Sequence, residues 1–216
     1  MEVINLMKKD ILVCKKYYAF SLIYIFSFSA LFSEYGILLY GMIAIGVNYL
    51  INNTSMAFDD KYKADIMINI LPVSRKNIVT AKYLNVLIVI FYVSVIYYLS
   101  VLVTAFKPIF GVKIPVVDLT TILISLLIIC IFNSIEIPLY FILGYQKTRF
   151  FGLITFFGFF ALSGFLANNI QINEKLNYFI NNSSNIIKCA LVLLITIFIS
   201  YISYIISINI YRKKDF

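Results

Sequence analysis

The sequence predicts an all-α membrane protein with six spanning helices, preceded by an N-terminal interfacial helix, and with both termini in the cytoplasm. Composition is the first observation: 62% of the 216 residues are hydrophobic, 13% are charged, and the mean hydropathy is +0.95. A water-soluble domain of this length needs more polar surface than that. The second observation is a set of apolar runs, each long enough to cross about 30 Å of hydrocarbon at about 1.5 Å per helical residue. The runs cover residues 17–32, 36–57, 78–106, 119–144, 150–167 and 186–211.

The distribution of lysine and arginine is the third observation, and it orients the chain. Lipid offers the backbone no hydrogen-bond partners, so spanning segments are helices or closed barrels, and these runs are too long for barrel strands. Six spans place both termini and the second and fourth connections on one side. That side carries fourteen of the eighteen lysines and arginines, so the positive-inside rule makes it cytoplasmic. Basic flanks facing anionic lipid explain the net charge of +8 without a nucleic-acid partner, and we expect one membrane domain over residues 1–216.

Residues 1–16 precede the first run and have the pattern of an amphipathic helix lying in the cytoplasmic interface. Their apolar side chains recur on one helical stripe and their polar side chains on another. Two alternatives stay open. The segment can be a stop-transfer flank without a role of its own, or residues 1–33 can be a cleaved signal peptide that ends at a small-residue string. The apolar stripe consists of Ile4, Met7, Ile11 and Cys14.

The reactive residues that the sequence lacks limit its chemistry. Without histidine there is no histidine-based catalytic triad, HExxH zinc motif or histidine proton relay. The three cysteines are too far apart in the sequence for a zinc motif or a disulfide framework. None of the eight glycines belongs to a GxxxxGK phosphate-binding loop, so the chain does not hydrolyse a nucleotide by that route. We therefore expect no enzyme activity, metal or cofactor on this chain.

The connection after the second run gathers eight charged residues between Phe58 and Leu84. Apolar side chains recur at helical spacing over residues 58–71, with charged side chains between them, which predicts a short amphipathic helix on the cytoplasmic surface. Pro72 ends this helix, because proline lacks an amide donor and disfavours the α conformation of the preceding residue. Ser74 is placed to cap the next helix, which at about 43 Å projects its start into the cytoplasm. The elbow over residues 58–77 is therefore expected to touch a partner; a merely solvated loop is the alternative.

Two stretches carry a family resemblance. LPVSRKNIVTAKYL, residues 71–84, resembles the connection between the second and third spans of small ABC-2 type permeases, the membrane halves of certain ABC exporters. IPLYFILGYQKTRF, residues 137–150, is similar to the end of that family's fourth span, where a proline, a glycine and basic residues recur. Six spans, cytoplasmic termini and an amphipathic first helix also agree. The short six-helix form resembles subunits that export phenol-soluble modulins, which are amphipathic peptides, from Gram-positive bacteria.

The resemblance implies that the work is divided between chains. A separate cytoplasmic ABC ATPase dimer would bind ATP and Mg, and two permease chains, identical or related, would pair around the path of an amphipathic or hydrophobic cargo. The connection over residues 58–77 would be a coupling helix that docks on the ATPase and receives its motion. Residues 169–185 would form an outer loop with a short helix near the exit. The coupling residues that the resemblance implies are Asp59, Asp60, Tyr62, Asp65, Ile66, Ile70, Leu71, Pro72, Ser74, Arg75 and Lys76.

Two further sets of residues are candidates for the transport path. Glu136 lies in the fourth run about 12 Å from its cytoplasmic end, where an isolated carboxylate is costly. We expect Glu136 to pair with Lys82 and brace an inner gate; the alternative is that it satisfies backbone groups freed by Pro138. The aromatic run over residues 150–165 predicts a smooth wall at a dimer interface, or else a lipid-facing helix. The residues expected on the path are Phe150, Phe157 and Ala161.

Three other functions remain open from the sequence alone. A secondary transporter generally carries several ionisable groups in its spans, and Glu136 is the one clear case here. A membrane-embedded enzyme needs a nucleophile with a base, or a metal site. A non-transporting immunity or scaffold protein can share the topology, because topology does not report turnover. Association with an ATPase and ATP-dependent transport would separate all three from an ABC exporter.

Overall fold

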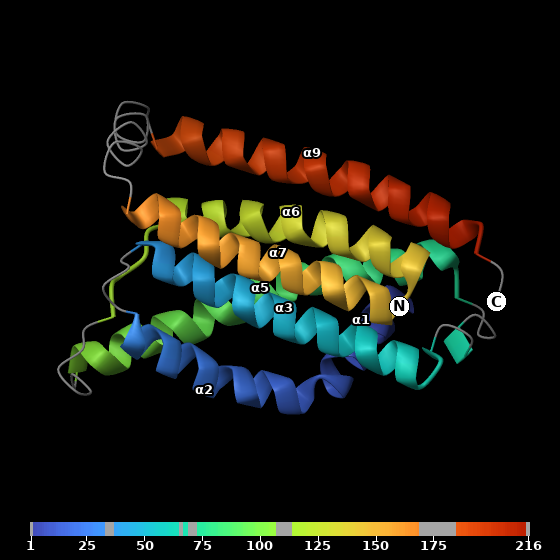
Figure 1. The fold of residues 1–216 in the computed structure, drawn as a ribbon, viewed down its shortest axis with the longest axis horizontal. Coiled ribbons are helices and arrows are strands. Elements are labelled where there is room, and N and C mark those ends of the chain that lie inside the picture. The colour runs from blue at the N-terminus through green and yellow to red at the C-terminus, as the bar shows by residue number, and fades with distance from the viewer. Residues whose placement is uncertain are drawn as a thin grey trace.

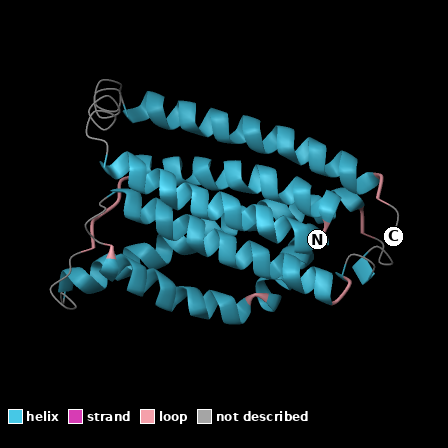
Figure 2. Cartoon of the chain, in the orientation of Figure 1, coloured by secondary structure: helices cyan, strands magenta, loops and turns pink. Residues whose placement is uncertain are grey.

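The structure, a computed structural model, describes residues 2–32, 37–64, 67–68, 73–106, 114–168 and 185–214. Within these residues all regular secondary structure is helical and there is no strand, as Figure 2 shows, so the predicted all-α class is confirmed. One short helix precedes six long ones. The helices are α1 (Glu2–Val13), α2 (Lys15–Leu31), α3 (Ile37–Lys61), α5 (Arg75–Phe106), α6 (Leu119–Leu143), α7 (Tyr145–Asn168) and α9 (Asn185–Arg212).

The six long helices lie side by side and alternate in direction along the chain (Figure 1). Both termini therefore lie at the same end of the bundle, which we call the terminal end. Helices α3 and α6 are central: α3 packs against α2, α5, α6 and α7, while α6 packs against α9, α7, α5 and α3. The short helix α1 contacts α5, α2 and α3 at the terminal end. This arrangement agrees with a chain that enters and leaves on the same side.

Helix α1 is a separate helix, as the amphipathic pattern predicts. It meets α2 at an angle of 62°, with Cys14 at the bend. Its buried face agrees with the predicted stripe at Cys14, which is buried, but differs from it in two places, because Asp10 is also buried and Ile4 is 57% exposed. A carboxylate inside the buried face requires partners on the neighbouring helices, and these are described below.

Helix length and composition identify fewer clear membrane spans than the sequence runs suggest. Among the described residues, α5, α6 and α9 are long and apolar enough to cross a membrane, and the bent pair α1 and α2 would add a fourth span. In α3, the side chains of Asn48, Asn52 and Asn53 lower the hydropathy, yet all three are buried against other helices. The polar content of α3 therefore reflects contacts inside the bundle.

A single residue joins α6 to α7. Gly144 has φ +76°, and its amide donates to the carbonyl of Tyr140 at 3.0 Å. This left-handed conformation favours glycine, which has no Cβ to clash with the neighbouring carbonyl. Helix α7 begins at Tyr145, five residues before the predicted start of the fifth span at Phe150. The basic residues that follow Gly144 are therefore helical and belong to the terminal end.

Pro138 lies inside α6 without ending it. Proline has no amide to donate to the carbonyl four residues earlier, which here belongs to Ser134. The hydroxyl of Ser203, on α9, donates to that carbonyl at 2.8 Å. The alternative prediction, in which Glu136 satisfies the freed backbone, is therefore wrong, because α9 supplies the donor.

Candidate functional site

The predicted coupling elbow begins later than the sequence pattern suggests. Helix α3 continues to Lys61, so Asp59 and Asp60 belong to its last turn and not to a separate surface helix. The chain turns at Tyr62 and Lys63, where Lys63 has φ +48°. The predicted residues Asp65, Ile66, Ile70, Leu71 and Pro72 lie outside the described residues.

Asp59 and Asp60 have opposite environments. Asp59 is 6% exposed, whereas Asp60 is exposed. A buried carboxylate does not reach a partner protein directly, so the coupling role of Asp59, which stays a prediction, would act through contacts inside the bundle. Tyr62 is 59% exposed and its ring stacks on Phe58 at 5.9 Å between centroids. Asp60 and Tyr62 thus remain available on the surface of the terminal end.

Asp59 is part of a cluster of four charged residues, Lys9, Asp10, Asp59 and Lys82, which we call the charge cluster. The Lys82 ammonium lies 2.5 Å from the Asp59 carboxylate and 3.1 Å from that of Asp10. The Lys9 ammonium lies 2.7 Å from Asp59 and 3.0 Å from Asp10. Each cation therefore bridges both carboxylates, and the cluster joins α1, α3 and α5.

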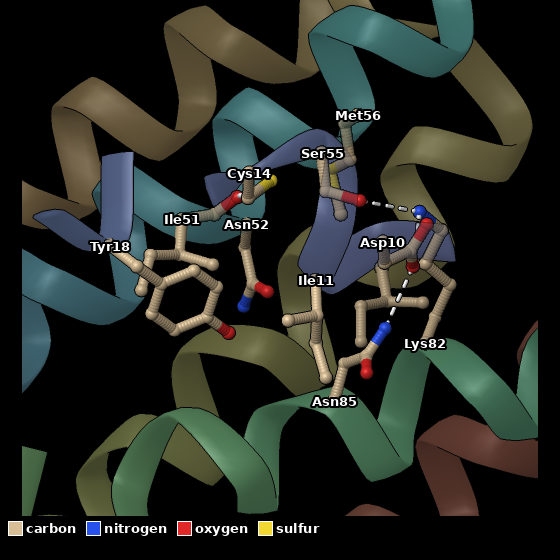
Figure 3. Close-up of a pocket in the computed structure, with 11 residues that line it drawn as sticks. Asp10, Ile11, Cys14, Tyr18, Ile51, Asn52, Ser55, Met56, Lys82 and Asn85 are labelled. Carbon is tan, nitrogen blue, oxygen red and sulfur yellow. Dashed lines mark hydrogen bonds and ion pairs between the residues drawn. The ribbon is translucent and has the colours of Figure 1, made fainter. Parts of the chain in front are cut away.

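Neutral polar side chains complete the surroundings of the charge cluster (Figure 3). The Lys82 ammonium donates to the Ser55 hydroxyl at 2.8 Å, and the Asn85 amide donates to Asp10 at 2.7 Å. The side chains of Asp10, Asp59 and Lys82 are at most 10% exposed. Burial raises the pKa of the Asp59 carboxyl, but the ammonium groups of Lys82 and Lys9 together lower it by more than burial raises it. The pKa of Asp59 therefore lies below its ordinary value. The two ammonium groups and two carboxylates of the cluster therefore balance in charge, and their ion pairs connect three helices.

The expected ion pair between Glu136 and Lys82 does not form in this structure. Lys82 faces α1 and α3, where its ammonium is shared by two aspartates. Glu136 instead accepts a hydrogen bond from the Asn53 amide of α3 at 3.1 Å. A second amide contact joins the same two helices, from Asn52 to Asn133 at 2.6 Å. Similar depth in the membrane suggested the pair, but depth does not say which face of a helix a side chain occupies. One signal was available for the correct partner, because Asp10 interrupts the apolar stripe of the first helix.

The start of α5 matches its prediction more closely. The Ser74 hydroxyl accepts the amide of Asn77 at 3.3 Å, which confirms Ser74 as the cap of a helix that begins at Arg75. The Arg75 guanidinium donates to the carbonyls of Arg212 at 2.7 Å and Lys214 at 3.0 Å, at the C-terminal end of α9. Cations near a helix C-terminus satisfy carbonyls that have no partner within the helix. Lys76, the next predicted coupling residue, is exposed.

The predicted path residues lie on the outer face of α7. Phe150 is 69% exposed, Phe157 is 64% exposed, and Ala161 is also exposed. Their spacing of seven and four residues places them on one stripe of the helix. Gly152 lies on the opposite, buried side, where α7 approaches Tyr49 and Glu136. The stripe is therefore free to face lipid or a second chain.

Comparison with known proteins assigns the chain to a family. The family of ABC-2 family transporter proteins matches residues 5–212. No curated protein and no solved structure is significantly similar to the chain. The matched region contains every described helix except the first residues of α1, and it includes the charge cluster and the elbow before α5. The chain therefore belongs to the ABC-2 family of transporter proteins.

Proposed function

We propose that this chain is the membrane subunit of an ATP-driven exporter that moves amphipathic peptides outward through the plasma membrane of a Gram-positive bacterium. Its family makes it a membrane permease component of an ABC transporter, which works with an ABC ATPase. The direction of transport, the peptide cargo and the organism are our proposals. In this scheme ATP and Mg bind the partner ATPase, and two copies of the chain, or the chain and a relative, form the path.

One observation carries the proposed coupling. The segment that connects α3 to α5 is fixed at both ends to other parts of the bundle. At its start, Asp59 joins α1 and α5 through the charge cluster. At its end, Arg75 joins α5 to the last turn of α9. A displacement of the connection by an ATPase would therefore be transmitted to four helices, which is how a rigid-body transition is driven from a distant site.

The second chain would pack against the exposed stripe of α7. Phe150, Phe157 and Ala161 offer a continuous apolar surface in this arrangement. Small residues along the helix would allow close approach between chains. Disulfide crosslinking between two copies with cysteine at position 157 or 161 tests this interface, and failure along the whole stripe would assign it to lipid.

The experiment that tests the function is reconstitution with the ATPase in vesicles. ATP-dependent uptake of an amphipathic peptide into inside-out vesicles supports the exporter. Transport driven by an ion gradient without the ATPase would indicate a secondary transporter, and association without transport would indicate a scaffold. The double substitution Ile66→Asp with Ile70→Asp should abolish coupling while the chain still inserts, because it charges the apolar face of the predicted docking surface. Val116→Asp is the control, since residue 116 is exposed and lies three residues before α6, which starts at the end of the bundle opposite the termini (Figure 1).

A further inference from the structure

A groove between α2, α3 and α7 has features of a ligand site that the coupling scheme does not use. It consists of two adjoining hollows, of about 620 Å³ and about 590 Å³. Both are lined by Ala57, Lys61, Tyr145, Arg149 and Leu153, so they form one continuous groove at the terminal end. The volume is in the range of sites for small ligands or short peptide segments.

The mouth of the groove is positively charged. Lys61 on α3 and Arg149 on α7 line both hollows. Asp60 lines one of them, so the two cations outnumber the carboxylate. Within the described part of the chain, neither Lys61 nor Arg149 forms an ion pair. The mouth therefore favours an anionic group, and the planar guanidinium of Arg149 suits a carboxylate.

The deeper part of the groove is aromatic, with two polar atoms that lack partners. Tyr24, Tyr49 and Phe156 form its walls. The Tyr24 hydroxyl and the Asn53 carbonyl oxygen are buried, and neither has a hydrogen-bond partner among the described residues. Asn53 is 8% exposed, and its amide nitrogen is already used by Glu136. An unpartnered acceptor at this depth is costly, so a ligand that brings a donor to it is favoured over one that does not.

These features distinguish between two kinds of amphiphile. The acyl chain of a phospholipid would bury the aromatic walls but would leave the Asn53 oxygen and the Tyr24 hydroxyl without partners. A peptide segment supplies amide donors and carbonyl acceptors along its length, together with apolar side chains. From this geometry we infer that the groove binds an amphipathic peptide, with a carboxylate of the peptide held between Lys61 and Arg149. This inference rests on the proposed export of peptides and names where this chain holds its cargo.

Equilibrium binding to the purified full-length chain in phosphatidylcholine nanodiscs tests the inference without ATP or a partner. The probes are two fluorescent amphipathic helical peptides that differ only in having glutamate or glutamine near the C-terminus. The wild-type chain should bind the glutamate peptide about tenfold more tightly, because charge-assisted hydrogen bonds are the stronger kind. Lys61→Gln with Arg149→Gln should remove this preference. The matched pair Lys63→Gln with Lys147→Gln, which removes the same charge from exposed residues outside the groove, should keep it.

Several results would overturn the inference. Equal binding of both peptides to the wild-type chain, or equal loss of preference in both double variants, removes the groove as the carboxylate site. Two results together would assign the groove to a lipid: added phosphatidylglycerol displaces the peptide, and the same lipid stabilises the wild type but not the variant at Lys61 and Arg149. Tyr24→Phe keeps the ring and should weaken both peptides about threefold, and unchanged affinity would exclude the deep part of the groove. Export of the peptide in vesicles by the Lys61 and Arg149 variant at the wild-type rate would contradict the groove while leaving the exporter function intact.

Discussion

Lys82 is the residue on which the charge cluster depends, since its ammonium bridges two carboxylates from different helices. Removing one member of a buried ion pair leaves an uncompensated charge, which typically costs 3–5 kcal/mol. Lys82→Met should therefore lower the free energy of unfolding by about 3 kcal/mol, the lower end of that range, because Lys9 still bridges both aspartates. The free energy of unfolding can be measured by titrating the protein in mixed micelles with dodecyl sulfate.

Two variants serve as references for the Lys82 prediction. Lys76→Met removes an exposed lysine on the same helix and should change stability by less than about 0.5 kcal/mol. Adding Asp59→Asn to Lys82→Met should restore part of the loss, because one of the two carboxylates is then neutral. Equal effects of Lys76→Met and Lys82→Met would contradict the charge cluster.

Gly152 allows α7 to approach α3 and α6 closely. A Cβ at this position would lie 2.9 Å from the Tyr49 ring and 3.0 Å from a carboxylate oxygen of Glu136. In Gly152→Ala, overpacking by the added methyl group should therefore cost the bundle about 1–3 kcal/mol of stability. The better helix propensity of alanine should offset about 1 kcal/mol of that cost. Gly158→Ala on the same helix is the matched control, because a Cβ there meets no described atom within 4 Å. Thermal unfolding in detergent should show a lower Tm for the first variant and an unchanged or higher Tm for the second.

At the scale of elements, α6 and α9 are joined through the carbonyl that Pro138 leaves without a helical donor. The Ser203 hydroxyl supplies the missing hydrogen bond to Ser134. Ser203→Ala should cost about 1–2 kcal/mol, because it leaves a partly buried carbonyl without its donor. In a Pro138→Ala background the amide of residue 138 can bond that carbonyl, so the same substitution should cost less.

The control for this pair is Ser207→Ala. Ser207 also bonds the Tyr83 hydroxyl, at 2.9 Å, but Ser203 bonds that hydroxyl as well. Its loss should therefore have a small effect in either background. If Ser203→Ala lowers stability equally with proline or alanine at position 138, the loss does not come from the hydrogen bond to the carbonyl of Ser134.

Some elements were predictable because their causes are local. The cap by Ser74 and the start of α5 depend on a few neighbouring residues, and the sequence pattern identified both. The glycine that separates α6 from α7 was also recognised as an end of a span. The partner of Lys82 could not be found in this way. It depends on the rotation of α1 and α3 about their axes, which packing against the other helices decides.

For the whole molecule, the order of the helices predicts that both termini lie on one side of the membrane, and the basic residues predict that this side is the cytoplasm. Single cysteines at positions 2 and 214, in a variant whose three native cysteines are replaced by alanine, should react with an impermeant maleimide only after permeabilisation. Cysteine at position 116, which is 72% exposed and lies just before the start of α6, should react in intact cells. Labelling of positions 2 and 116 from the same side would contradict six crossings.

The all-helical class was predictable, since long apolar runs follow from membrane thickness, whereas the six crossings and their orientation stay predictions. The polar interior was not predictable. Asparagines and carboxylates in α3 and α6 bond one another across the bundle, so the residues that weaken the hydropathy signal are the ones that fix the packing. A hydropathy window averages over all faces of a helix and cannot separate these inward residues from the lipid-facing ones.

The charge cluster also sets an order for biogenesis. Translation produces α1 with Asp10 and then α3 with Asp59 before it produces Lys82 on α5. A nascent chain that ends before α5 therefore has both carboxylates and Lys9 but lacks Lys82, the second ammonium that bridges them. Because α1 packs chiefly against α5, we expect the N-terminal helix to reach its final position only after α5 has been made.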